Sequence, residues 1–132
     1  MAGIGYADSK YYTSKILVYP ISADLTSAGD VGTFDFTEAI KITEVGIIVS
    51  TTVAGDTTAP VIAIKEGSTE LATVTVPDNT SAGDVVKSTG LSITNIASGD
   101  TLTFNVKTAA NDSGTAAGAG YIYIKYYEKF VS

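Results

Sequence analysis

The feature that most constrains this chain is a strict two-residue alternation near its end, over residues 121–130. Successive side chains of a β-strand point to opposite faces, so this run predicts a strand with two different faces. The aliphatic face is expected to pack on a core and comprises Ile122, Ile124 and Tyr126. The other face sets aromatic residues around a lysine, namely Tyr121, Tyr123, Lys125 and Tyr127. An isolated monomer seldom exposes so much aromatic surface, and we interpret this outer face as a subunit or partner interface.

The rest of the chain follows the same pattern, with Val, Ile and Thr abundant and turn residues recurring every 10 to 15 positions. It predicts eight strands, the sixth of them interrupted: 15–19, 32–36, 39–52, 60–65, 70–76, 84–88 with 91–93, 101–108 and 121–130. We expect an all-β, single-domain, antiparallel β-sandwich over residues 15–132, made of two four-stranded sheets with jelly-roll-like connections. An immunoglobulin-type sandwich is the alternative, although its Cys and Trp markers are missing.

The longest apolar run, residues 39–52, changes phase in the middle. Ile40 and Ile42 share one parity, whereas Val45, Ile47 and Val49 have the other. One extra residue in the strand, a β-bulge, brings both sets to the same face. The sequence therefore predicts a bulge near residues 44–46, beside a glycine.

Residues 1–14 differ from the rest, because small residues alternate there with large apolar ones. We expect a flexible N-terminal arm that binds a partner or a neighbouring copy through Ile4, Tyr6, Tyr11 and Tyr12. The simpler alternative is a frayed terminus.

Composition removes several kinds of chemistry. The 132 residues include no Cys, His, Trp or Arg, and the formal charge is −6. Without His or Cys there is no imidazole or thiolate for a catalytic pair or a metal site. Without Arg, and with a negative charge, nucleic acid is not an expected partner. No apolar run approaches the roughly 20 residues of a membrane helix, and no signal-peptide pattern is visible. We expect no enzyme activity, cofactor, metal or membrane contact.

A short phrase recurs along the chain, with glycine followed by aspartate before a strand. It occurs at residues 27–31, 54–57, 81–85 and 97–101. Glycine accepts a positive φ and the Asp carboxylate accepts hydrogen bonds from nearby backbone N–H groups, so the phrase predicts turns. Calcium binding is the alternative, but each phrase offers a single carboxylate.

The outer tyrosine face leaves three interpretations open. Tyrosines are enriched at protein interfaces, they can stack on sugar rings, and they can be covered within the fold. A hydrolytic site assembled from scattered acids is a further alternative, which needs two carboxyl groups roughly 5–10 Å apart.

The order of these features resembles a class of small virion proteins of tailed bacteriophages. The resemblance rests on ADLTSAGD at residues 23–30, ITEVGIIV at 42–49, SGDTLTF at 98–104 and GAGYIYIKY at 118–126. It implies a capsid decoration (cement) protein, a homotrimeric β-sandwich that binds the major capsid protein on the outer surface of the virion after synthesis in the host cytoplasm. The alternative within the same class is a host-recognition or carbohydrate-binding module of a tail or fibre.

Overall fold

The computed structural model describes residues 11–21, 25, 28–53, 58–109 and 117–129. Two of the expected arm residues, Ile4 and Tyr6, lie outside this part of the chain. The backbone of Tyr11 and Tyr12 belongs to the first strand, while their side chains are not among those described. The strand itself therefore begins four residues earlier than the sequence pattern indicated.

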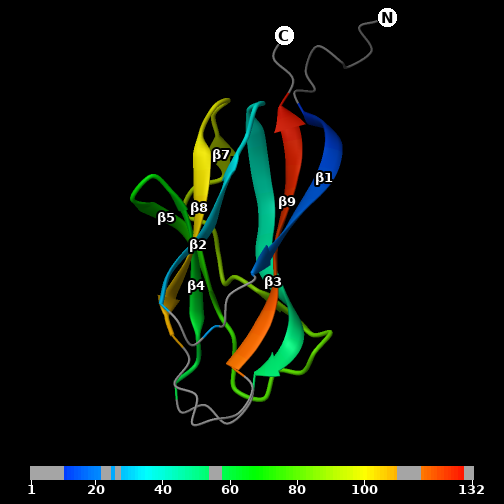
Figure 1. Cartoon of the computed structure of the whole chain (residues 1–132). Coiled ribbons are helices and arrows are strands. Elements are labelled where there is room, and N and C mark those ends of the chain that lie inside the picture. Colours follow the sequence, from blue (N-terminus) through cyan, green and yellow to red (C-terminus); the bar gives the residue numbers. More distant parts are fainter. Residues whose placement is uncertain (1–10, 22–24, 26–27, 54–57, 110–116, 130–132) are drawn as a thin grey trace, which may run out of the picture.

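The described residues form nine strands and no helix (Figure 1). The strands are β1 (Tyr11–Ile21), β2 (Gly29–Asp35), β3 (Ile40–Val53), β4 (Val61–Glu66), β5 (Thr69–Thr75), β6 (Val85–Lys87), β7 (Asn95–Ile96), β8 (Thr101–Thr108) and β9 (Ala117–Lys129). One sheet has the order β1-β9-β3-β6, with β7 also paired to β3, and the other has the order β2-β8-β4-β5. Every pairing is antiparallel. The expected all-β sandwich is confirmed.

The interrupted sixth strand is also present, with its second half displaced along the chain. Both β6 and β7 pair with β3, so together they occupy one position in the five-stranded sheet. The second piece lies at Asn95–Ile96, whereas we expected residues 91–93. The reason is that Ser92 is held by the other sheet. Its backbone N–H donates to the carbonyl of Leu71 at 2.8 Å, and its hydroxyl donates to the carbonyl of Glu70 at 2.7 Å.

The core lies between the two sheets and is filled from both. Ile47 and Ile122 of the five-stranded sheet are fully buried, as are Ile62 and Phe104 of the four-stranded sheet. The expected inward face of the last strand is confirmed: Ile122 and Ile124 are each 1% exposed, and Tyr126 is partly buried and packs against the core. Apolar burial from two facing sheets is the dominant favourable term for a fold of this kind.

Strand β3 contains the predicted bulge, one position before the expected range. Ile42 pairs with Tyr126 and Glu44 pairs with Lys125, which leaves Thr43 as the extra residue. The hydroxyl of Thr43 donates to the carbonyl of Lys125 at 3.2 Å. As a result Ile40 and Ile42 before the bulge, and Val45, Ile47 and Val49 after it, are all buried.

Two of the recurring Gly-Asp phrases form the same turn. Gly83 and Gly99 have φ values of 95° and 87°, which L side chains rarely adopt. In each turn the following aspartate accepts a hydrogen bond from the backbone N–H three residues earlier, at 3.1 Å for Asp84 and 3.3 Å for Asp100. The turn interpretation is confirmed for these two phrases. The phrase at residues 54–57 lies outside the described part.

Removal of Thr43 tests the bulge. The deletion should place Ile40 and Ile42 on the outer face, because the side-chain period of a strand is two. Exposing two buried isoleucines costs about 3–6 kcal/mol of unfolding free energy, measurable by urea denaturation. The control is Thr43→Ala, which keeps the bulge and loses one hydrogen bond worth about 1 kcal/mol. A deletion variant as stable as this control contradicts the prediction.

Candidate protein-interaction surface

The four predicted interface residues of β9 all point to the outer side of the five-stranded sheet. They alternate with the buried Ile122 and Ile124, and their partners on β3 have the same orientation. The pairs are Tyr121 with Ile48, Tyr123 with Gly46, Lys125 with Glu44, and Tyr127 with Lys41. The sequence thus identified correctly which side chains share this face.

Aliphatic residues of the neighbouring strands add to the same face. Among the described residues the exposed large hydrophobic side chains are Ile16, Val18, Val85, Tyr121 and Tyr127, with exposed fractions of 54%, 46%, 54%, 42% and 37%. Ile16 and Val18 pair with Lys125 and Tyr123, and Val85 pairs with Ile48, so all five lie on one side of one sheet. We call this surface, formed by the outward side chains of β1, β9, β3 and β6, the apolar face.

The sequence analysis missed Ile16, Val18 and Val85, although the sequence holds a signal for them. Residues 15–19 and 46–49 contain apolar side chains at both parities, as does the pair Val85-Val86. Strands that are apolar on both faces are typical of sheets covered on both sides. Here the described chain covers only the inner side.

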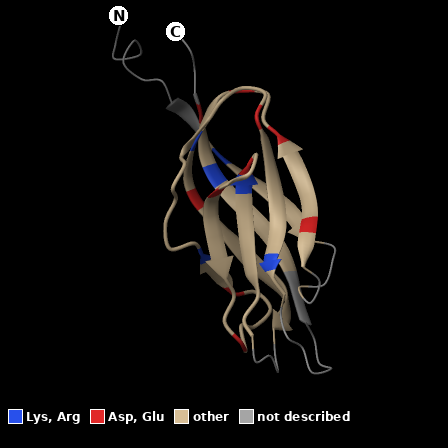
Figure 2. Cartoon of the chain, turned by 90° about the vertical axis from the view of Figure 1, so that its left-hand side faces the viewer, with Lys and Arg blue, Asp and Glu red and all other residues tan. Residues whose placement is uncertain are grey.

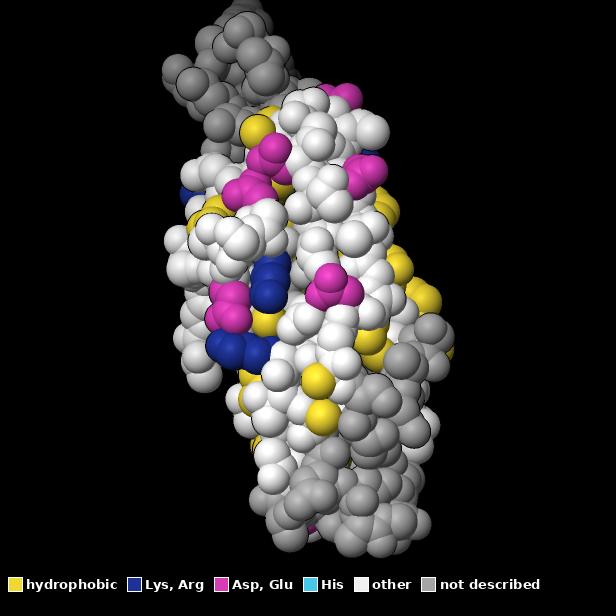
Figure 3. Space-filling model, turned by 60° about the vertical axis from the view of Figure 1, so that its left-hand side comes forward, with side chains coloured by type: hydrophobic (Ala, Val, Ile, Leu, Met, Phe, Trp, Pro, Cys, Tyr) yellow, Lys and Arg dark blue, Asp and Glu magenta, His cyan; other side chains and the backbone are white. Residues whose placement is uncertain are grey.

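The outer side of the four-stranded sheet is polar by contrast. Its outward positions on β2, β5 and β8 are mostly uncharged, namely Thr33, Thr73, Thr75, Thr101, Thr103 and Asn105, and the charged ones are Asp30, Asp35, Glu70 and Lys107. From this side most of the ribbon carries no charge (Figure 2), and a few basic, acidic and hydrophobic side chains lie scattered among uncharged side chains and backbone (Figure 3). Such alternation, apolar inward and polar outward, is what a solvent-facing antiparallel sheet requires. The two sheets therefore differ in what they present to their surroundings.

One expectation for the outer face was wrong, because Tyr123 is only 2% exposed. Its ring lies against the sheet over Gly46, where a Cβ atom would come within 2.5 Å of the ring carbon Cε2. A glycine at this position leaves room for the aromatic ring on the pleated surface. The exposed tyrosines are thus Tyr121 and Tyr127, and Tyr123 forms part of the floor between them.

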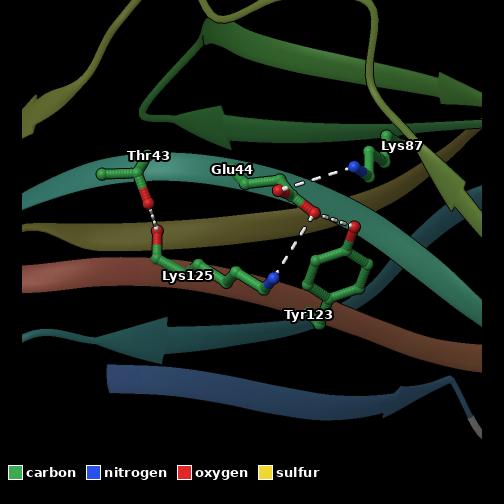
Figure 4. A network of polar contacts seen from close by, with 5 residues as sticks. All are labelled: Thr43, Glu44, Lys87, Tyr123 and Lys125. Carbon is green, nitrogen blue, oxygen red and sulfur yellow. Dashed lines mark hydrogen bonds and ion pairs between the residues drawn. The ribbon is translucent and has the colours of Figure 1, made fainter. Parts of the chain in front are cut away.

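The hydroxyl of Tyr123 donates a short hydrogen bond, 2.5 Å, to the carboxylate of Glu44 (Figure 4). Lys87 and Lys125 flank the same carboxylate, each with its Nζ atom 3.9 Å from an oxygen of Glu44. The hydrogen bond from Tyr123, then the charges of Lys125 and Lys87, lower the pKa of Glu44. Burial and the bonded carboxylate raise the pKa of Tyr123. Glu44 is therefore an anion that is held in place at neutral pH.

A shallow hollow opens beside this network. Its volume is about 210 Å³ and it is lined by Ile16, Glu44, Ile48, Val85, Lys87, Tyr123 and Lys125. Apolar side chains thus share it with two lysines and one glutamate. This combination can hold an apolar side chain with a charged group beside it, and it lacks a nucleophile paired with a base.

Two carboxyl groups meet elsewhere in the structure, at Glu66 and Asp100. A hydrogen bond between them, together with burial and their mutual repulsion, raises the pKa of Glu66. The sequence could not reveal this pair, because Glu66 ends β4, Asp100 directly precedes β8, and only the fold brings the two together. Neither lines the hollow on the apolar face. No cluster of three or more potential metal-binding carboxylates occurs within the described ranges.

Comparisons of the chain with protein-family models, with curated protein sequences and with solved structures find no match. Because the described residues include no helix, they include none that is long and apolar enough to cross a membrane.

Gly46→Ala tests the packing of Tyr123. Gly-to-Ala changes in strands usually stabilise slightly, but here the new Cβ atom meets the Tyr123 ring and the backbone carbonyl of Val86, both at 2.5 Å. The expected loss of unfolding free energy is about 1–3 kcal/mol in chemical denaturation. Gly90→Ala is the matched control, because no atom lies within 4 Å of its Cβ position. Equal stability of the two variants contradicts this arrangement.

Tyr123→Phe removes the hydrogen bond to Glu44 and should cost about 1–2 kcal/mol at pH 7. The lowered pKa of Glu44 means that this contribution exists above its unfolded pKa of about 4.3 and is lost as the pH falls through the folded pKa. The raised pKa of Tyr123 means that the wild-type chain also loses stability as the pH rises above about 10.

Denaturation from pH 3 to 11 measures both effects. The stability difference between wild type and Tyr123→Phe should shrink at both ends of this range, and the exposed Tyr121→Phe should stay within about 0.5 kcal/mol of wild type. A difference that does not vary with pH excludes the charged hydrogen bond.

Proposed function

We propose that this protein is a non-enzymatic structural protein of a tailed-bacteriophage virion, and that it decorates the capsid by binding the major capsid protein. The observation that carries the proposal is the apolar face: all exposed large hydrophobic side chains of the described residues lie on one side of one sheet. Contiguous apolar patches of a few hundred Å² on soluble proteins typically mark interaction sites. The identity of the partner rests on the resemblance described above.

The geometry supports binding through a preformed surface. The face is built from the central strands β3 and β9, whose opposite sides are buried in the core, so its side chains start from a fixed backbone. Less conformational entropy is lost when a preorganised surface binds. Many copies on a symmetric particle would add weak contacts together, which suits a protein that stabilises a shell.

The strand order supports the jelly-roll interpretation. β1 pairs with β9, β2 with β8, β3 with β6 and β7, and β4 with β5, which is the nested pairing of one long hairpin wrapped into two sheets. A homotrimer on the outer surface of the virion, with residues 1–10 extending the contacts of the sandwich, completes the proposal.

A host-recognition or carbohydrate-binding module of a tail or fibre is the second candidate. One observation favours it: Tyr121 and Tyr127 are exposed at the same side of β9 and could stack on sugar rings. A glycan array probed with the full chain separates the two candidates, since only this second function predicts glycan binding that Tyr121→Ala abolishes.

Co-sedimentation with purified capsids of the phage that encodes the chain tests the proposal. Val18→Thr with Val85→Thr keeps side-chain shape and strand propensity but places hydroxyl groups in the contact, which costs about 1 kcal/mol or more each. Affinity should fall at least about 10-fold. Thr75→Ser with Thr103→Ser, on the polar sheet, is the control that should bind normally.

Deleting residues 1–10, which leaves β1 intact, should weaken binding further without changing the midpoint of thermal unfolding. Unaltered capsid binding by the Val18/Val85 variant refutes the assignment of the apolar face. No capsid binding by the wild-type chain refutes the proposed function itself.

A further inference from the structure

The apolar face has a charge balance opposite to that of the rest of the chain. The strand register puts these charged residues of the described chain on it: Lys41, Lys87, Lys125 and Glu44. Thirteen Asp and Glu residues and five Lys residues remain for the rest of the sequence. Interfaces are generally arranged so that surfaces of opposite potential meet. A basic surface on an otherwise acidic protein is therefore complementary to an acidic partner.

Lys87 and Lys125 are only loosely engaged within the chain. Their Nζ atoms lie 3.9 Å from the Glu44 carboxylate, at the outer limit of an ion pair, and their side chains are 65% and 52% exposed. Glu44 already accepts the much shorter hydrogen bond from Tyr123. Two lysines thus share one carboxylate, and one positive charge is left uncompensated beside the hollow.

The hollow and the lysines together define what fits. Ile16, Ile48 and Val85 give the hollow apolar walls, and the two lysines stand at its side. An apolar side chain can enter it while a carboxylate on an adjacent residue reaches a lysine. The whole face measures roughly 15 by 20 Å over four strands and seven residues of β9, which is broad for a small ligand and matches the central part of a protein interface.

We infer that the apolar face binds an acidic protein surface, with an apolar side chain of the partner in the hollow and neighbouring carboxylates against Lys87 and Lys125. The inference rests on the proposed function and deepens it, because it states the chemistry of the surface to which the protein attaches. A second copy packed face to face is the weaker occupant, since that arrangement brings two groups of three lysines together.

Peptide titration of the full ¹⁵N-labelled chain, followed by NMR, tests this chemistry without knowledge of the partner. Three synthetic twelve-residue peptides serve as probes: alternating Leu and Glu, alternating Leu and Lys, and alternating Gly and Glu. The first carries both apolar groups and carboxylates, and each of the others lacks one of these. The Leu/Glu peptide should shift backbone signals of β1, β9, β3 and β6, and its affinity should fall as salt rises.

Charge variants locate the contact. Lys87→Gln with Lys125→Gln should weaken Leu/Glu binding about 5- to 10-fold, as expected for two exposed ion pairs. Lys65→Gln with Lys107→Gln changes the total charge equally but alters the other sheet, and should leave the affinity unchanged. Equal affinity for the Leu/Lys peptide, no binding of the Leu/Glu peptide, or equal effects of the two double variants would each overturn the inference.

Analytical ultracentrifugation of the wild-type chain tests whether a second copy of the chain occupies the apolar face. A dimer that Ile16→Lys dissociates, and that Lys125→Glu strengthens or leaves intact, assigns the face to a second copy and likewise overturns the inference. These outcomes can be told apart from a failure of the proposed function. Binding to capsids that does not depend on charge contradicts only this inference. Charge-selective peptide binding by a chain that does not bind capsids contradicts only the capsid assignment.

Discussion

The pairing of β3 with β9, and the extra residue Thr43 within it, decides which side chains of the five-stranded sheet face the core. Before Thr43 the inward positions of β3 are Ile40 and Ile42, and after it they are Val45, Ile47 and Val49. Without the bulge one of these groups lies on the wrong side of the sheet. The same residue fixes the outer face, because it sets Glu44 opposite Lys125 and Gly46 opposite Tyr123.

A tyrosine ring packed over a glycine is the second recurring feature of this fold. It occurs once on each side of the five-stranded sheet. On the inner side Tyr19 crosses to the other sheet, where a Cβ atom at Gly32 would lie 2.0 Å from its hydroxyl oxygen, and its ring contacts Phe104 with 4.7 Å between centroids. On the outer side Tyr123 covers Gly46. In each case the missing side chain leaves the space that the ring occupies, and the ring supplies the buried area that glycine cannot.

The packing of tyrosine over glycine explains where prediction from the sequence succeeded and where it failed. Alternation within a strand is local, so the faces of β9 and the phase change in β3 could be read directly, and both are correct. Burial of Tyr123 depends on which residue of another strand lies opposite, and the sequence does not state that register. Similarly, Val85 and Ile16 join the apolar face only through pairing across four strands. The hydrogen bonds of Ser92 to β5 prevent residues 91–93 from pairing with β3 as expected. No local sequence pattern reveals these bonds.

The sheet edges are consistent with the proposed association through a face. Edge strands offer unpaired backbone groups to other chains, and natural proteins protect them with proline, lysine or short strands. Edge strand β1 contains Lys15 and Pro20, and the opposite edge is divided into strands of three and two residues, β6 and β7. Open-ended growth of this sheet is thus hindered on both sides. The proposed association instead uses the side chains of the apolar face, where contact needs no backbone pairing and the lysines around Glu44 would select the partner by charge.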